Sequence, residues 1–338
     1  MTPVVSVIVL NYNGRRWLPG CFAALARQVD APVHELLFVD NCSTDGSVEF
    51  MKSAFPTVRI VGTGANVGFA AGNNAGARTA RGKYLAFLNN DTVPADDWLQ
   101  QLVRAHAEGP ERSLVTSRIV FLDRPDVIDS AGDGYLRAGG AFKIGHRESA
   151  GAFERPRDVF GACGAAFSIS RELFDRLGGF DERFFMVYED VDLSYRARLM
   201  GHGCWYAAAA CVRHAGSGTL GRASDTAVYY GQRNLEWTWA KNTPASLLIR
   251  TLPAHLAYSL AGIAHYVAIG KGGPAIRGKI AALAGLPLLL RNRRTVQGKR
   301  TVGTAALRSA MTGRWWTQKR REKSARLDLA DHQDGRVA

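Results

Sequence analysis

Residues 4–14 read VVSVIVLNYNG, an apolar run that ends at a turn signal. β-Branched side chains such as Val and Ile favour strands, and the sequence Asn-Tyr-Asn-Gly favours a turn. The stretch therefore predicts a first β-strand, followed by a helix over about residues 16–28. The N-terminus shows no basic leader, and its apolar run is too short for the core of a signal peptide.

Three more strand-like runs follow, at residues 35–39 (ELLFV), 58–61 (VRIV) and 84–88 (YLAFL). Helix-like stretches with short connections separate them, which gives the order β-α-β-α-β-α-β. Because parallel strands need such crossovers, we predict an α/β fold with a mainly parallel central sheet and flanking helices. Ligands of these sheets bind outside the carboxyl ends of the strands. Asn11, Asp40 and Asp91 are expected at that edge.

The part of the chain that follows these strands is less regular. Residues 110–160 contain scattered Gly and Pro and predict strands and loops without clear bounds. Beyond them the sequence predicts helices near residues 170–177 and 189–200, and a strand at residues 204–212 that ends before His214. The five cysteines are scattered and form no C-x-x-C pair, which indicates a reducing compartment rather than disulfides or a zinc cluster.

Two acids stand at the ends of predicted strands. Asp40 could accept a hydrogen bond from the imide N–H of uracil or thymine, or it could be a turn or helix-capping residue, a role that suits Asp45 better. Asp91 could bind Mg²⁺ or Mn²⁺ together with phosphate oxygens, or it could be a turn residue before Pro94.

A further acid pair, Glu189-Asp190, follows an aromatic cluster at residues 184–188 and opens a helix-like run. Acids at a helix N-terminus can simply offset the helix dipole. With two more acids just upstream, however, the group is more typical of a functional site than of a cap. Asp192 is expected to be structural and to pair with Arg196 one turn later.

His214 lies between the last predicted strand and a loop of Gly and Ser. A lone histidine is usually structural, but neutral imidazole is also a common metal ligand. Both interpretations of His214 stay open on the sequence alone.

The formal charge of +13 is confined to the C-terminal part. Residues 241–338 hold 18 Lys and Arg against 4 Asp and Glu, a charge of +14, whereas residues 1–240 hold 25 against 26, a charge of −1. A neutral body with a basic, apolar tail fits an anionic membrane surface better than nucleic acid. For the last twenty or so residues, a merely solvated basic tail is the competing interpretation.

From residue 244 the sequence becomes amphipathic. Residues 251–270 carry no charged side chain apart from two His and are about long enough to span a bilayer, but they include Pro253. One helical stripe is apolar (Ile249, Leu252, Leu256, Ile263, Val267) and another is more polar (His255, Ser259, Gly262, His265). The pattern favours a helix lying in the membrane interface, with spanning second and plain core packing third. We therefore predict a catalytic domain at 1–240 and a basic, amphipathic helical, membrane-associating region at 241–338.

Six segments spread over residues 4–240 together resemble family 2 glycosyltransferases with a GT-A fold, above all a rhamnosyltransferase-like subgroup that builds bacterial surface polysaccharides. In chain order they are VSVIVLNYNG, LLFVDNCSTDGS, NVGFAAGNNAG, YLAFLNNDT, LGGFDERFFMVYEDVDLSYRARLMG and VRHAGSGT. The resemblance implies inverting transfer of a sugar, with rhamnose as one candidate, from a nucleoside-diphosphate donor. It implies a glycan or polyprenyl-linked acceptor and a peripheral position on the cytoplasmic face of the membrane.

The resemblance also implies roles for individual residues. Asp190 is expected to be the general base with Glu189 beside it, and Asp91 and His214 are expected to hold Mg²⁺ or Mn²⁺. The residues implied in nucleotide binding are Asn11, Asp40, Asn66, Asn74, Asn89 and Arg233. The family's metal motif is commonly Asp-x-Asp, and Asn89 stands at its first position here, which leaves Asp91 as the only carboxylate of the motif.

Two other functions fit parts of the pattern. A nucleotidyltransferase acting on sugar phosphates also uses acids and Mg²⁺ on such a sheet, but it usually has a Gly-rich basic loop after the first strand. This chain has NYNGRRW there, with a single Gly. A membrane scaffold that binds nucleotide sugars without catalysis is the other alternative, and the acid pair Glu189-Asp190 and His214 argue against it.

Overall fold

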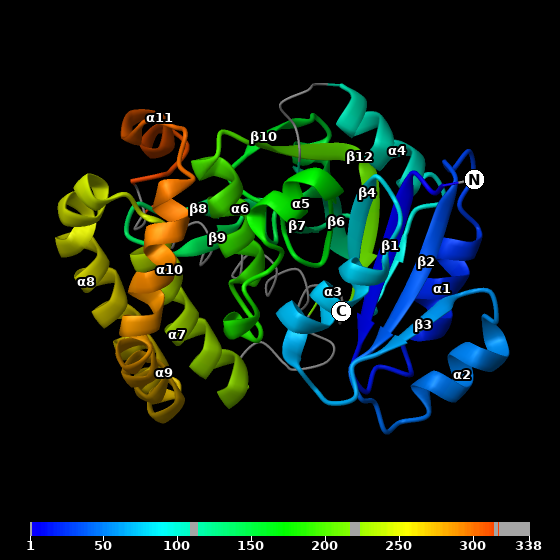
Figure 1. The fold of residues 1–338 in the computed structure, drawn as a ribbon, viewed down its shortest axis with the longest axis horizontal. Coiled ribbons are helices and arrows are strands. Elements are labelled where there is room, and N and C mark those ends of the chain that lie inside the picture. Colours follow the sequence, from blue (N-terminus) through cyan, green and yellow to red (C-terminus); the bar gives the residue numbers. More distant parts are fainter. Residues whose placement is uncertain (1, 109–113, 217–223, 314–316, 318–338) are drawn as a thin grey trace, which may run out of the picture.

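The computed structural model describes residues 2–108, 114–216, 224–313 and 317, and its centre is a mixed β-sheet (Figure 1). Its first four strands are β1 (Val5–Asn11), β2 (His34–Asp40), β3 (Arg59–Gly62) and β4 (Tyr84–Asn89). They lie in the order β3-β2-β1-β4, and every neighbouring pair is parallel. The predicted β-α-β-α-β-α-β order is thereby confirmed, and all four strands end at the same edge of the sheet.

The sheet continues beyond β4 with β11 (Ala166–Ser170), β6 (Leu114–Phe121), β12 (Cys204–His214) and β10 (Arg157–Val159). β11 is antiparallel to both β4 and β6, and β12 is parallel to β6. β12 therefore runs in the same direction as β1 and ends at the same edge. The short strands are β5 (Thr92–Pro94) against β12, β7 (Ile128–Ser130) against β6, and the hairpin of β8 (Asp133–Tyr135) and β9 (Ala141–Lys143).

Helices cover both faces of the sheet and bury its apolar side chains. One face packs against α1 (Leu18–Ala26), α2 (Ser47–Ala54) and α4 (Trp98–Ala107). The other face packs against α3 (Gly68–Thr79), α5 (Arg171–Leu177) and α6 (Glu189–Leu199). Local signals explain the bounds of α5, because Ser170 caps the amide of Leu173 and Gly178 ends the helix in the left-handed conformation.

The C-terminal helices form a layer of their own at one end of the molecule, next to α6 and away from β1–β3 (Figure 1). They are α7 (Asp225–Asn242), α8 (Ala245–Ala268), α9 (Gly272–Ala284), α10 (Leu286–Gly298) and α11 (Thr304–Ser309). The predicted domain boundary after residue 240 falls within the last turn of α7. The basic tail from residue 318 onward lies outside the described residues.

The amphipathic helix α8 is oriented with its apolar stripe outward. Ile249 is 71% exposed and Leu256 is 53% exposed, whereas His255 on the polar stripe is only 2% exposed. His255 donates through Nε2 to the Glu236 carboxylate on α7, and Ser259 donates to the same carboxylate. Further exposed apolar side chains on α8, α9 and α10 are Leu260, Val267, Ile280, Leu283, Leu288 and Leu290. An exposed apolar surface of this extent indicates association with a membrane rather than plain core packing.

Among the described residues, α8 is the single helix that is long and apolar enough to cross a membrane by itself. Helices α9 and α10 meet the same criterion only as a pair, and they are bent by 63° at the break between them. By length and composition, α8 could therefore either span a membrane or lie on its surface.

We predict that Gly68 is required for stability where α3 begins. Its φ is +82°, and an added Cβ would lie 2.6 Å from the carbonyl oxygen of Phe185. The matched control is Gly46, which has φ +78° but no atom within 4 Å of the added Cβ. Gly46→Ala should lower the free energy of unfolding by about 1–2 kcal/mol through the left-handed backbone alone. Gly68→Ala should lower it by about 1–3 kcal/mol more, because of the clash. Equal losses in urea unfolding would contradict this prediction.

Candidate active site

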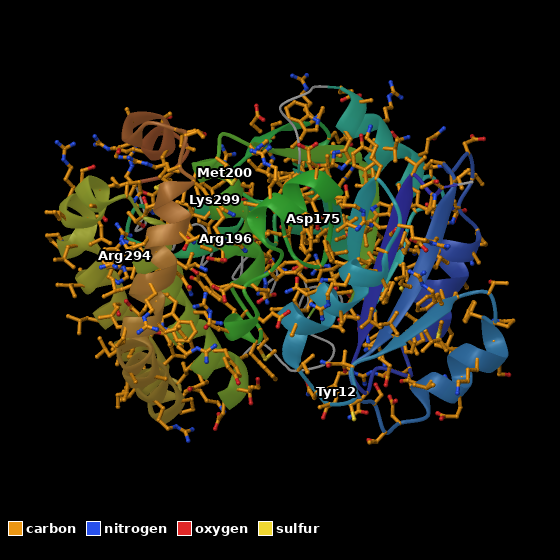
Figure 2. The ribbon with its side chains drawn as sticks, viewed as in Figure 1. Tyr12, Asp175, Arg196, Met200, Arg294 and Lys299 are labelled. Atoms are coloured by element: carbon orange, nitrogen blue, oxygen red, sulfur yellow. The ribbon has the colours of Figure 1, made fainter. Side chains whose placement is uncertain are left out.

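The predicted nucleotide-binding edge of the sheet is set by strand register. Asn11 pairs with Asp40 across β1 and β2, and Leu10 pairs with Asn89 across β1 and β4. The last residues of three parallel strands therefore lie side by side. Tyr12, which follows β1 directly, marks this edge at the lower end of the sheet in Figure 2.

Buried amides fix the loop after β1. The Asn90 amide donates to Asn11 Oδ1 at 2.6 Å, and the Asn11 amide donates to Ser43 Oγ at 3.0 Å. Gly14 passes so close to this pair that an added Cβ would lie 2.1 Å from Asn90 Nδ2. Asn11 thus holds the loops after β1, β2 and β4 in one arrangement.

Asp40 and Asn66 both make local hydrogen bonds. The backbone N–H of Ser43 donates to Asp40 Oδ2 at 3.1 Å, which closes a turn after β2. Asn66 Oδ1 accepts from the Asn41 amide at 2.9 Å and from the Gly68 N–H at 3.1 Å. The turn interpretation of Asp40 therefore accounts for its hydrogen bond from Ser43. The side chain of Asp40 is buried, whereas that of Asn66 is exposed. A role in nucleotide binding stays a prediction for both.

Asn74 and Arg233 are engaged away from the strand ends. The Asn74 amide exchanges two hydrogen bonds with the backbone of Phe180, at 2.9 Å each, and so links α3 to the turn after α5. Arg233 donates to the carbonyls of Arg183 and Phe184 and stacks on Trp237 at 4.2 Å. Contact of either side chain with a nucleotide stays a prediction.

The short strand β5 brings Asp91 and His214 together. Thr92 pairs with His214 across β5 and β12, and the N–H of Ala215 donates to the carbonyl of Asp91. His214 Nε2 lies 3.2 Å from Asp91 Oδ1, and both side chains are buried. His214 Nε2 nevertheless has no aligned hydrogen-bond partner among the described residues.

The other ring nitrogen of His214 meets Asp129, which lies on β7. His214 Nδ1 is 2.8 Å from Asp129 Oδ2, and the same carboxylate pairs with Lys143 at 2.8 Å and with His146 at 3.3 Å. Burial alone would raise the pKa of Asp129, but Lys143, His146 and His214 lower it well below its ordinary value. Asp129 is therefore an ionised anchor that orients the imidazole and leaves Nε2 facing Asp91.

Burial alone would lower the pKa of His214, but the hydrogen bond to Asp129 and the nearby carboxylate of Asp91 together raise it. The donor set fits a divalent cation, since adjacent ligand atoms of an octahedral Mg²⁺ lie about 3 Å apart. Asp91 and His214 would then supply two ligands, and substrate phosphate and water the rest. The described residues contain no cluster of three or more side chains able to hold a metal.

The acid pair Glu189-Asp190 begins α6, and it lies next to Gly164, two residues before β11. Asp190 Oδ2 accepts from the N–H of Gly164 at 2.7 Å, and an added Cβ on Gly164 would lie 2.7 Å from the same oxygen. Burial raises the pKa of Asp190 despite the hydrogen bonds from Gly164 and Val191. A carboxylate of raised basicity is suited to accept a proton.

Glu189 is more deeply buried than Asp190, and its Oε2 has no hydrogen-bond partner within the described ranges. Burial, and next the charge of Asp190, raise the pKa of Glu189 well above its ordinary value. The pair thus divides into a buried Glu189, whose neutral form is favoured by burial, and a more accessible Asp190.

Sequence reasoning missed several residues of the site. Asp129 stands on a strand of three residues in the region that gave no periodic signal, and Lys143, which pairs with it, stands on β9, another strand of three residues. Gly164 has no neighbouring motif in the sequence. A carboxylate in an apolar context, as in VIDSAGDGY at residues 127–135, was the one available signal.

Two curated relatives cover much of this chain. The chain is 29% identical over 255 residues to the N-acetylglucosaminyl-diphospho-decaprenol L-rhamnosyltransferase of Mycobacterium tuberculosis, covering 66% of this chain and 79% of that protein. It is 31% identical over 210 residues to the O-antigen biosynthesis protein RfbC of Myxococcus xanthus, covering 59% of this chain. The match spans only 16% of RfbC, so the whole activity of that protein does not transfer.

Solved structures of glycosyltransferases share the fold. The mannosyltransferase PcManGT of Pyrobaculum calidifontis, solved with GDP-Man and Mn²⁺, superposes with a TM-score of 0.53 at 21% identity, covering 92% of this chain and 86% of that one. GalNAc-T7, solved with UDP, GalNAc and Mn²⁺, gives a TM-score of 0.55 at 17% identity, covering 71% of this chain and 49% of that one. The GT-A fold expected from the sequence is thus confirmed. The family model for glycosyl transferase family 2 matches residues 6–178, just over half of the 338 residues, and the chain belongs to that family.

Proposed function

We propose that this glycosyltransferase moves a sugar, with inversion, from a nucleoside-diphosphate donor to a hydroxyl of a lipid-linked glycan acceptor. The observation that carries the proposal is the meeting of Asp91 and His214 at 3.2 Å, from distant parts of the chain. Lys143, which pairs with the carboxylate behind His214, also acts electrostatically on Asp190 and so relates the acid pair to the same site. Family membership argues for sugar transfer over nucleotidyl transfer. Relatives that bear names in surface-glycan synthesis support the assignment to cell-surface polysaccharide synthesis.

The residues of the site suit a single in-line displacement. Asp190 accepts the proton of the acceptor hydroxyl while its oxygen attacks the anomeric carbon, and the nucleoside diphosphate leaves from the opposite face. A divalent cation held by Asp91 and His214 would neutralise the charge of the departing diphosphate. Asp129 keeps His214 in the orientation that such binding needs.

The identity of the donor rests on two considerations. The position of Asp40 at the end of β2, beside Asn11, supports a role as acceptor for the imide of uracil or thymine, and the name of the mycobacterial relative specifies L-rhamnose. We infer dTDP-L-rhamnose as the first donor to test and a polyprenyl-diphosphate-linked glycan as the acceptor class.

The exposed apolar side chains of α8–α10 suit a peripheral position on the membrane. The same helices carry basic residues, among them Arg294 on α10 (Figure 2), and residues 241–338 as a whole have a formal charge of +14. Lys and Arg near an anionic leaflet contribute about 1 kcal/mol each to binding. We infer attachment to the cytoplasmic face, where a nucleotide-sugar donor and a lipid-linked acceptor can meet.

Asp190→Asn should keep donor binding and lose transfer, because it removes the base but keeps the size of the side chain. We expect turnover with dTDP-L-rhamnose to fall by about 10²–10⁴-fold. The dissociation constant of the donor, measured on the same variant, should stay unchanged. Wild-type activity should fall as the pH drops through the raised pKa of Asp190. Asp175→Asn, on the exposed surface of α5 (Figure 2), controls for the loss of one charge. A variant that retains more than about a tenth of wild-type turnover would rule out Asp190 as the base.

Metal affinity should depend on the anchor as well as on the ligands. His214→Ala and Asp91→Ala should both weaken the binding of Mn²⁺ in the presence of dTDP, measured by calorimetry. Asp129→Asn should weaken it by about 10–100-fold, as expected for a carboxylate behind a metal-binding histidine. Asp126→Asn removes an exposed carboxylate nearby and should leave the affinity unchanged. Tight Mn²⁺ binding by Asp129→Asn would refute the role of the anchor.

Charged substitutions on α9 should release the protein from membranes. Ile280 and Leu283 are 61% and 71% exposed, and burying each in lipid should contribute about 1.5–3 kcal/mol. The double variant Ile280→Glu, Leu283→Glu should therefore bind vesicles of phosphatidylcholine and phosphatidylglycerol at least about tenfold more weakly. Val29→Glu with Val33→Glu, at exposed apolar positions around the start of β2, is the matched control. Equal sedimentation of both double variants with vesicles would place the membrane contact elsewhere.

A further inference from the structure

The segment that leads into the acid pair has an unusual backbone. Phe185, Val187 and Tyr188 all have positive φ, at +63°, +65° and +75°, although none is glycine. Bulky residues in such conformations cost of order 1–3 kcal/mol each and persist only where the surroundings enforce them. Tyr188 is also the residue directly before α6, so this backbone sets where Glu189 and Asp190 begin.

The buried side-chain amide of Asn234, on α7, contacts this segment. Asn234 Nδ2 lies 2.9 Å from the carbonyl oxygen of Phe184, 2.8 Å from that of Met186 and 2.7 Å from that of Val187. The side chain of Asn234 is fully buried, and its Oδ1 accepts from Arg233 Nε at 2.9 Å. The two N–H bonds of the Asn234 amide thus serve three backbone carbonyls of the segment.

The first turn of α3 contacts the same segment through backbone groups. The carbonyl oxygen of Phe185 accepts from the N–H groups of Phe69 and Ala70 at 2.6 and 3.2 Å, in the first turn of α3. The segment is therefore fixed between α3 and α7. The contact with α3 uses backbone groups, whereas the contact with Asn234 uses a side chain that one substitution can remove.

From this geometry we infer that Asn234 is a positioning residue for the transfer reaction: it holds residues 184–188 in their strained backbone and thereby sets the position of Asp190. The inference rests on the role of Asp190 in the proposed function. The chemistry requires an amide at residue 234. A carboxylate would place an acceptor against three carbonyls. Alanine would remove the Asn234 donor from the carbonyls of Met186 and Val187, while that of Phe184 would keep Arg233.

A simple stabilising role is the competing explanation, and the chain offers a control for it. Tyr195 on α6 donates to Thr243 Oγ1, just beyond α7, at 3.2 Å, through another buried hydrogen bond between the same two parts of the fold. Tyr195→Phe removes that bond without touching residues 184–188. Loss of stability alone should therefore affect both variants alike.

The test measures local opening and turnover separately in the full-length protein. In Asn234→Ala, amide hydrogen exchange within residues 184–190 should accelerate by at least about tenfold, while β1–β4 keep their protection. The kcat for dTDP-L-rhamnose should fall by roughly 10–100-fold, as for a misplaced catalytic group, with KM little changed. Tyr195→Phe should change neither quantity. If Asn234→Ala does not fold, Asn234→Ser, which keeps one donor, should show the same pattern more weakly.

Unchanged exchange of residues 184–190 in the Asn234 variant would overturn the inference. A fall in kcat no larger than that of Tyr195→Phe would overturn it too. Failure of the wild-type protein to turn over dTDP-L-rhamnose would instead count against the proposed donor, and the exchange measurement would still decide whether Asn234 holds the segment.

Discussion

The buried carboxylate of Asp192 joins the sheet-bearing body to the C-terminal helices. It accepts from Arg196 at 2.8 Å within α6, and from Lys241 and Asn242 at 2.7 and 2.8 Å at the end of α7. Removal of one partner from such a buried set typically costs 3–5 kcal/mol, because a charge is left uncompensated. Asp192 stands in the first turn of α6, the same turn that carries the acid pair, so this turn links the candidate site to the helical layer.

The parts of the fold that sequence patterns predicted are those with long, regular signals. The first four strands are apolar runs of four to seven residues with helices between them, and the structure has them in that order. The pairing of Asp192 with Arg196 followed from their spacing alone and is confirmed. Strands β7, β8 and β9 have three residues each, which is too short for any periodicity, and no pattern could predict them.

The candidate site shows the same division. Asp91, His214 and Asp190 stand in recognisable motifs, but the meeting of Asp91 with His214 depends on β5, a three-residue strand that sequence patterns do not predict. Asp129 orients His214, and Asn234 holds the segment before α6. Each is a single polar side chain in an apolar stretch of sequence, so neither belongs to a sequence motif. Likewise, the stripes of α8 were predictable, but not that the polar one faces the protein, because that depends on Glu236 of another helix.

The way α7 ends bears on how such proteins can be recombined. Its final carbonyls, from Ala240 to Thr243, accept hydrogen bonds from Arg293 and Gln297 on α10, some fifty residues further along the chain. The helices after residue 244 are therefore not an independent module attached by a linker. A chimera that exchanges them must supply equivalent donors to the end of α7, or the helix that carries Asn234 loses its cap.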